Sequence, residues 1–208
     1  LASTRDRIGI LDEFTGAVPL SEQRETRGFI ETSLPRRADG STYNPMVVSD
    51  GVAQVSLASA RSLRDGEWLT DEIITFMIKR IIQPASTRTG FFNSHFLTRL
   101  LETSHRYDYA QVRRWGTRLD GGIRGIDELF IPINQSNRHW LFARVDMRHQ
   151  RIERDDSNGQ NTDSQRYLTA ILRYVYDERW SVPLDSGPGF RDTGPGFGAW
   201  STAWTLRD

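Results

Sequence analysis

The spacing of apolar residues along the chain changes twice, and each change predicts a different kind of structure. Residues 1–60 show no regular period, and the stretch 33–44 is rich in turn-forming residues. We expect an extended or partly ordered arm there, although padding without a structural role explains the pattern equally well. From Trp68 onward, apolar residues recur every three or four positions, as on the buried face of a helix.

Three helices are predicted in the first half of the domain, over residues 70–82, 93–103 and 109–119. The first can begin with Thr70 as its cap, and Asp71 then lies in the first turn, where the helix dipole favours an anion. A short buried strand at residues 91–92 separates the first helix from the second. The glycines at 121–122 are expected to end the third helix.

Beyond residue 127 the apolar period becomes two, which predicts strands. We expect three strands with short turns, over residues 128–134, 139–146 and 151–156. A helix around 167–175, a strand at 181–185, a glycine- and proline-rich loop at 186–198 and a helical start after Gly198 complete the chain. Helices, then strands, then a helix indicate an α+β fold with a central mixed or antiparallel sheet, rather than a doubly wound parallel sheet.

The amino-acid composition excludes several classes of partner and of chemistry. Lys plus Arg and Asp plus Glu are both 27, so the net charge is zero and nucleic acid is not an expected partner. No apolar run approaches the ~18 residues of a membrane span, so no membrane is expected either. The chain has no cysteine, which excludes disulfides, thiolate metal sites and thiol chemistry within these residues.

His139 and Asp156 are the strongest candidates for chemistry. If the strands 139–146 and 151–156 form a hairpin, the start of one lies beside the end of the other. A carboxylate there can accept from one imidazole nitrogen and leave the other as a base. Opposite charges are also ordinary cross-strand neighbours, so from spacing alone a simple ion pair is the more economical explanation. The other histidines show no ligand spacing, so neither a metal nor a cofactor is expected.

Four segments together resemble the ubiquitin-like-protein-specific cysteine proteases, the SUMO-protease family, across more than half of the chain. Two of them, EWLTDEIITFMIKRI and FFNSHFLTRLLE, resemble the family's W-L-x-D-x-I-I and F-x-x-F-x-x-x-L helices. The other two, ELFIPINQSNRHWLFARVD and RIERDDSNGQN, resemble its P-I-N…H-W strand pair and its I-x-x-x-D-S strand end. The resemblance implies a papain-like or adenain-like fold for residues 61–208, a central mixed sheet flanked by helices.

The resemblance also assigns roles to individual residues. His139 matches the family's general base, and Asp156 matches its orienting acid. Trp68 and Trp140 match the two tryptophans that form a tunnel over the Gly-Gly end of the substrate. Asp71 matches an acid that contacts the body of the ubiquitin-like protein. A slot closed by two indoles admits glycines, which lack a Cβ, and rejects most other residues.

The nucleophile segment departs from the family pattern. The family has a glutamine followed by Asp-Cys-Gly, whereas residues 190–204 contain neither glutamine nor cysteine. In one alignment Phe197 takes the position of the cysteine, and in another Ala199 does. We favour Ala199, because alanine is the usual replacement for a removed nucleophile. Without a thiolate, acyl transfer through a covalent intermediate cannot occur.

The expected function is that of a deconjugating isopeptidase, acting after Gly-Gly of SUMO or another ubiquitin-like protein, in an inactive form without its cysteine. The alternatives are a natural pseudoprotease that binds such proteins without cleaving them, and an acetyltransferase related by fold. A monomer is expected, in the cytoplasm or nucleus. The basic residues are almost all arginine, and the resemblance extends to bacterial effectors, so a host cell is the expected location if the protein is one of these.

Overall fold

The computed structural model describes residues 24, 27, 28, 30–49, 51, 53–82, 88–101, 106–135, 137–157, 164–183, 190–192 and 194–207. The chain divides into two compact units, residues 1–76 and 77–208, and each is described by itself. None of the helices in the described residues is long and apolar enough to cross a membrane.

The first unit contains a small hairpin and a short helix. Strand β1 (Met46–Ser49) pairs antiparallel with β2 (Gln54–Ser56), and α3 (Leu57–Ala60) follows directly. The Ser56 hydroxyl caps α3 by accepting from the backbone N–H of Ser59 at 3.2 Å. Within residues 1–60, where we expected at most pieces of structure, the chain therefore forms a β-hairpin with a helix beside it. The domain boundary at residue 60 stays a prediction.

The first predicted helix forms, but its second half is wider than an α-helix. Helix α4 (Asp71–Met77) continues as a π-helical turn, Ile78–Ile82. The Thr70 carbonyl accepts from the Ile74 N–H at 3.1 Å, so the helix begins where the sequence predicts.

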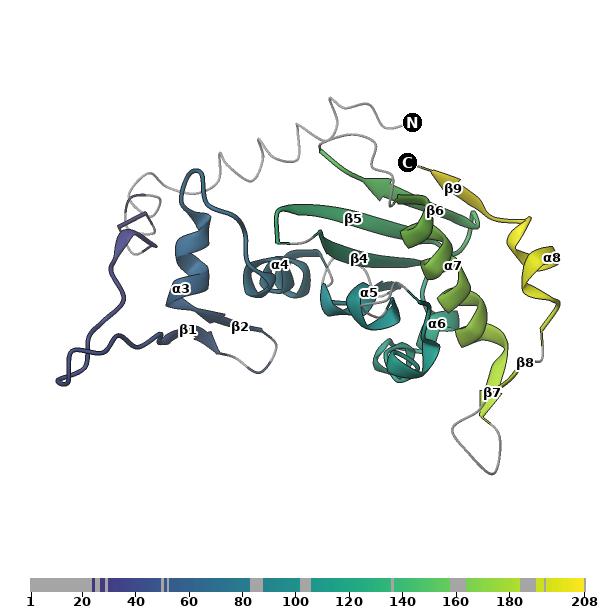
Figure 1. The fold of residues 1–208 in the computed structure, drawn as a ribbon, viewed down its shortest axis with the longest axis horizontal. Coiled ribbons are helices and arrows are strands. Elements are labelled where there is room, and N and C mark those ends of the chain that lie inside the picture. The colour runs from purple at the N-terminus through teal and green to yellow at the C-terminus, as the bar shows by residue number, and fades with distance from the viewer. Residues whose placement is uncertain are drawn as a thin grey trace. The chain divides into compact units, whose positions relative to one another are not determined.

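A mixed five-stranded sheet organises the second unit (Figure 1). Its strands, in spatial order, are β3 (Thr89–Phe91), β4 (Glu128–Gln135), β5 (His139–Asp146), β6 (Arg151–Asp155) and β9 (Thr205–Arg207). The three central strands are antiparallel, and each edge strand is parallel to its neighbour. The predicted α+β fold with a central mixed sheet is confirmed.

Alternation along the central strands buries one face of the sheet under helices. The alternating buried apolar residues of β4 and β5 are Leu129, Ile131, Ile133, Leu141, Ala143 and Val145. They share a core with α5 (His95–Leu100), α6 (Gly122–Gly125) and α7 (Ser164–Trp180). Asn93 Oδ1 accepts from the His95 N–H at 3.1 Å and so helps to start α5.

The helix predicted over residues 109–119 does not form. Two 3-10 turns, Tyr109–Gln111 and Gly116–Arg118, take its place. Val112 between them has a φ of −123°, outside the helical range, and its side chain is fully buried. A Cβ on Gly116 would collide with the Glu178 carboxylate, so packing against α7 shapes this segment.

The C-terminal part contains two strands that the sequence pattern missed. A short hairpin, β7 (Ser181–Pro183) with β8 (Phe190–Asp192), follows α7. Helix α8 (Phe197–Ser201) confirms the predicted helical segment around Gly198. Strand β9 was not predicted. Residues 184–189 and 193, within the predicted strand and loop, lie outside the described residues.

Candidate active site

The hairpin of β5 and β6 brings His139 beside Asp156. Asp146 pairs with Arg151 next to the turn, and Phe142 pairs with Asp155 at the far end of β6. Asp156 follows directly and therefore faces the first residues of β5. Nε2 of His139 lies 2.5 Å from Oδ1 of Asp156, so the two side chains form a short hydrogen bond.

Burial makes this pair more than a surface contact. The side chain of Asp156 is 3% exposed and that of His139 is 11% exposed. A buried carboxylate is costly unless charged or hydrogen-bonding partners satisfy both of its oxygens. With Nε2 engaged by Asp156, Nδ1 is the imidazole nitrogen that can accept a proton from a reacting group.

Arg154 is a site residue that the sequence reasoning missed. Its Nη1 donates to Oδ2 of Asp156 at 2.9 Å, and its side chain is 3% exposed. The carboxylate is thus held between a histidine on one oxygen and an arginine on the other. A signal was available in the sequence, because residues two apart on a strand share a face. Asp155 lies on the other face and is exposed, which agrees with the choice of Asp156.

The three predicted substrate-binding residues are divided between the two units. Trp140 follows His139 in β5, is half-buried and pairs with Asn134 of β4. Trp68 is 60% exposed, an unusual state for a tryptophan, and belongs to the first unit. Asp71 is the first residue of α4 and also belongs to that unit. A tunnel formed by the two tryptophans therefore stays a prediction.

Phe197 and Ala199, the two candidate nucleophile positions, lie at the other end of the sheet. Both are in α8, which packs on α7 and leads into β9. Thr205, the first residue of β9, pairs with Arg151 at the start of β6, whereas Asp156 follows the end of β6 (Figure 1). Arg151 and Asp156 are five residues apart along the strand, which corresponds to roughly 16 Å. The structure therefore does not bring either position to the histidine.

An aromatic cluster holds α8 in this place. The Phe197 ring lies 5.4 Å from that of Tyr176, between ring centroids, and the Arg173 guanidinium lies 4.7 Å from the centroid of Phe197. Trp200 contacts Tyr176 and also Trp204, which is buried in the core. Ala199 itself is exposed. This end of the sheet is built for packing rather than for proton transfer.

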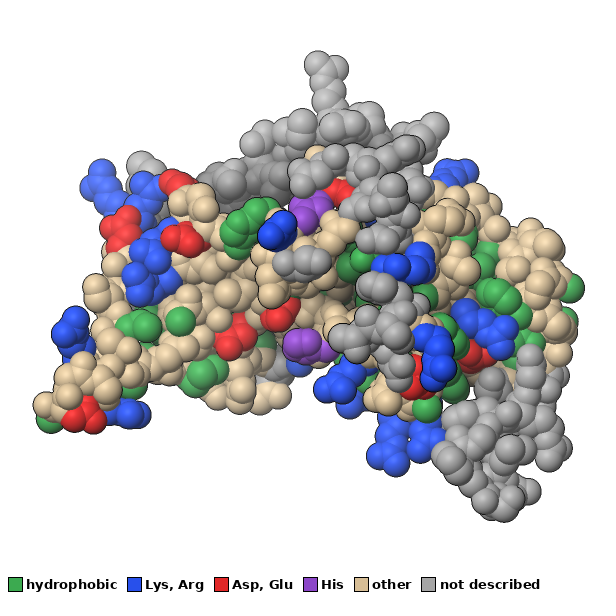
Figure 2. Space-filling model, in the orientation of Figure 1, with side chains coloured by type: hydrophobic (Ala, Val, Ile, Leu, Met, Phe, Trp, Pro, Cys, Tyr) green, Lys and Arg blue, Asp and Glu red, His purple; other side chains and the backbone are tan. Residues whose placement is uncertain are grey.

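A partly buried carboxyl group also lies near the C-terminal end of α7. Burial raises the pKa of Glu178 above its usual range, and the nearby hydroxyls of Tyr174 and Tyr109 offset this only in part. No group of three metal-ligating side chains gathers anywhere in the described part of the chain. On the face that Figure 2 shows, arginines and acidic side chains are interspersed rather than separated into patches of one sign.

The comparisons with known proteins agree with the fold. The family described as "Ulp1 protease family, C-terminal catalytic domain" matches residues 67–182. This range includes every predicted site residue except Phe197 and Ala199. Ubiquitin-like-specific protease 1 of Saccharomyces cerevisiae is 32% identical over 145 residues, which are 69% of this chain and 22% of that protein. Ubiquitin-like-specific protease 1A of Arabidopsis thaliana is 30% identical over 172 residues, or 77% of this chain and 32% of that protein.

Solved structures of Ulp1-type protease domains also align with this chain. The C-terminal Ulp1 protease domain in complex with Smt3, the yeast ortholog of SUMO, aligns with a TM-score of 0.66 and 27% identity, covering 78% of this chain and 68% of that one. The Ulp1-like SUMO protease catalytic domain of Chaetomium thermophilum aligns with a TM-score of 0.54 and 16% identity, covering 91% and 69%, and supports the fold alone. The chain spans about a fifth to a third of the length of the curated relatives. It belongs to the Ulp1 protease family and corresponds to that family's C-terminal catalytic domain.

Proposed function

We propose that this domain recognises the Gly-Gly end of SUMO or a related ubiquitin-like protein and supplies the base and orienting acid of an isopeptidase site. The observation that carries the proposal is the buried His139–Asp156 pair, with Arg154 on the second carboxylate oxygen. An imidazole held in one tautomer by a buried carboxylate is the arrangement that general-base catalysis needs. The likeness to a domain solved in complex with Smt3 supports the choice of partner.

The chemistry assigned to His139 is proton transfer at Nδ1. In a cysteine isopeptidase, Nδ1 takes the thiol proton while the thiolate attacks the carbonyl carbon of the terminal glycine. The imidazolium then gives that proton to the departing lysine amine, and water later releases the acyl group. Asp156 stabilises the imidazolium through Nε2. The 208 residues contain no cysteine, so by themselves they are expected to bind a modifier without this step.

Recognition is assigned to Trp68, Trp140 and Asp71. Two indoles closing a slot favour glycine, since any Cβ would meet a ring. Each indole can bury about 150–250 Å² against the modifier's tail. Asp71 at the start of α4 would contact the body of the modifier through charge. A cytoplasmic or nuclear location and a monomeric state belong to this same proposal.

The test is calorimetric titration of the domain with SUMO, with ubiquitin and with one further ubiquitin-like protein. We expect at least one of them to bind, and Trp68→Ala and Trp140→Ala each to raise Kd more than about thirtyfold, as for anchors worth ~2 kcal/mol. Tyr43→Ala, which removes another exposed aromatic of the first unit, is the control and should change Kd less than about threefold. Asp71→Asn should weaken binding mainly at low salt.

Two outcomes would contradict the proposal. If no modifier binds the parent domain at any salt concentration, recognition is not its function, although the fold assignment stands. If the tryptophan variants bind as tightly as the parent, the modifier's tail does not enter at these residues.

A further inference from the structure

Arg154 is buried beside the candidate active site, at a position that the family pattern leaves open. In the pattern I-x-x-x-D-S, Ile152 and Asp156 take fixed positions, whereas Arg154 falls on an unspecified one. Its side chain is 3% exposed, as is that of Asp156, and Nη1 donates to Oδ2 at 2.9 Å. A guanidinium is almost never enclosed to this degree without a charged partner. Arg154 is therefore a feature of this chain that the motif does not account for.

The geometry of β6 directs Arg154 toward Asp156. Residues 152, 154 and 156 share one face of the strand, and Ile152 on that face is fully buried. On the neighbouring strand Arg154 pairs with Ala143, which is also fully buried. Because the side chain opposite is only a methyl group, the long arginine side chain has space beside it. The guanidinium thus reaches one oxygen of Asp156, while the imidazole of His139 reaches the other.

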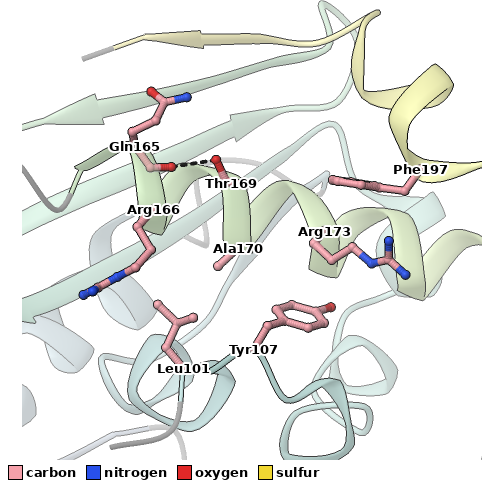
Figure 3. A pocket seen from close by; sticks show the side chains of 8 residues that line it. All are labelled: Leu101, Tyr107, Gln165, Arg166, Thr169, Ala170, Arg173 and Phe197. Carbon is pink, nitrogen blue, oxygen red and sulfur yellow. Dashed lines mark hydrogen bonds between the residues drawn. The ribbon is translucent and has the colours of Figure 1, made fainter. Parts of the chain in front are cut away.

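Two other arginines of the second unit are more exposed to water than Arg154. Figure 3 shows Arg173 extending from α7 along the wall of a pocket. Its Nε lies 3.2 Å from Oδ1 of Asp177, and its side chain is 37% exposed. Arg151, on the opposite face of β6, has a side chain that is 27% exposed. Water screens the charges of such residues, whereas the charge of Arg154 acts on its neighbours at a low local dielectric.

The charges of the three enclosed side chains decide which state of His139 is favoured. Arg154 and Asp156 carry one charge of each sign, so together with a neutral imidazole they form an uncharged cluster. An imidazolium would leave an unbalanced positive charge in a site where such a charge is costly. Without Arg154 the balance is reversed, because the carboxylate would then be neutralised by an imidazolium. Both nitrogens of an imidazolium carry protons, so its Nδ1 cannot act as a base.

We propose that Arg154 is a positioning residue that keeps His139 neutral, with a proton on Nε2 and the lone pair of Nδ1 free. It acts through Asp156, because it holds Oδ2 in place, leaves Oδ1 for the imidazole and cancels the charge of the carboxylate. When Nδ1 takes a proton from a reacting group, that group retains the negative charge that balances the new imidazolium. The inference rests on the role of His139 as the base in the proposed function.

The experiment is NMR spectroscopy of the histidine rings in the ¹⁵N-labelled domain at about pH 8, above the range in which a free imidazole titrates. Protonated and unprotonated ring nitrogens have widely separated ¹⁵N chemical shifts, and His139→Gln identifies the signals of His139 by their loss. In the parent we expect a protonated Nε2 and an unprotonated Nδ1. In Arg154→Met, the ratio of molecules with a proton on Nδ1 to those without it should rise at least about tenfold, because a strong hydrogen bond between charged groups is removed.

Three further variants separate the charge of Arg154 from its shape. Arg154→Lys keeps the positive charge and should hold the Nδ1 ratio within about threefold of the parent. Arg154→Gln keeps a donor without the charge and should resemble Arg154→Met, so it gives the same test if the methionine variant does not fold. Arg151→Met, the matched control, removes an arginine from the opposite face of the same strand and should leave the shifts of His139 unchanged.

Three results would overturn the proposal. They are a proton on Nδ1 in the parent, a proton on Nδ1 in Arg154→Lys, and an unchanged Nδ1 ratio in whichever of Arg154→Met and Arg154→Gln fold. Titration of SUMO into the parent domain keeps this test apart from that of the proposed function. A parent that shows the expected shifts but binds no modifier would contradict recognition of the modifier and leave the role of Arg154 standing.

Discussion

The side chains packed around the two ends of strand β6 differ in kind, because those at one end are charged and those at the other are aromatic. At the end near Asp156, charged side chains are buried in a chain of hydrogen bonds from His139 through Asp156 to Arg154. At the other end, the rings of Tyr176 on α7 and of Phe197, Trp200 and Trp204 pack against one another in edge-on and tilted contacts. Burial at the Asp156 end of β6 therefore orients polar side chains, whereas burial at the other end stabilises the packing of aromatic rings. Cysteine-protease chemistry requires groups of the first kind.

The largest expected effect is at the charged end. Asp156→Ala should lower the free energy of unfolding by about 3 kcal/mol or more, because it removes the carboxylate from beside a buried arginine and a nearly buried histidine. Asp155→Ala, on the same strand but exposed, is the matched control and should change it by less than about 0.5 kcal/mol. Urea unfolding of both variants measures the difference. Equal losses would show that the charged cluster contributes no more than a surface contact.

A smaller loss is expected at the aromatic end. Phe197→Ala removes a ring that contacts Tyr176 and Arg173, and should cost about 1–2 kcal/mol. Gly198→Ala, one residue further along α8, is the control: no atom lies within 4 Å of the Cβ it would add. Thermal unfolding should show a lower Tm for the first variant and an unchanged or slightly higher one for the second. A Phe197→Ala variant as stable as the parent would mean that α8 is not held by this cluster.

Glu178 should make the free energy of unfolding depend on pH. Its pKa is raised in the folded state by burial, so its contribution to stability is fully present below the unfolded pKa of about 4.3. That contribution is lost as the pH rises through the higher folded pKa, because the ionised carboxylate must then stay buried. Glu178→Gln should therefore flatten the fall in stability above about pH 4, and urea unfolding between pH 4 and 7 measures the slope. Parallel curves for parent and variant would contradict this account.

The smallest expected effect is on catalysis. Ala199→Cys and Phe197→Cys should both leave the domain without turnover of a fluorogenic Gly-Gly substrate, because α8 lies at the end of β6 away from His139. A SUMO protease assayed in the same buffer is the positive control. Thiol-dependent turnover that is lost again in the His139→Ala background would show that α8 can reach the histidine. Our preference for Ala199 as the nucleophile position would then stand.

The features that follow from local periodicity could be predicted from the amino-acid sequence. Alternation fixed the three central strands, and the short turn between residues 146 and 151 placed the start of β5 beside the end of β6. This is why His139 and Asp156 could be paired in advance. The family motifs carried the same information, since they lie within the matched residues 67–182.

The remaining features could not be predicted, because they depend on contacts between residues that are distant in the sequence. Gly116 packs against Glu178 of α7, and two 3-10 turns form where the local pattern favours a helix. Strand β9 is three residues long and pairs with residues of β6 that lie 54 positions earlier in the chain, so no local period could reveal it. The pairing of β9 with β6 places α8 at the end of β6 beside the aromatic cluster. The spacing of the motifs therefore could not show that the two candidate nucleophile positions lie so far from the histidine.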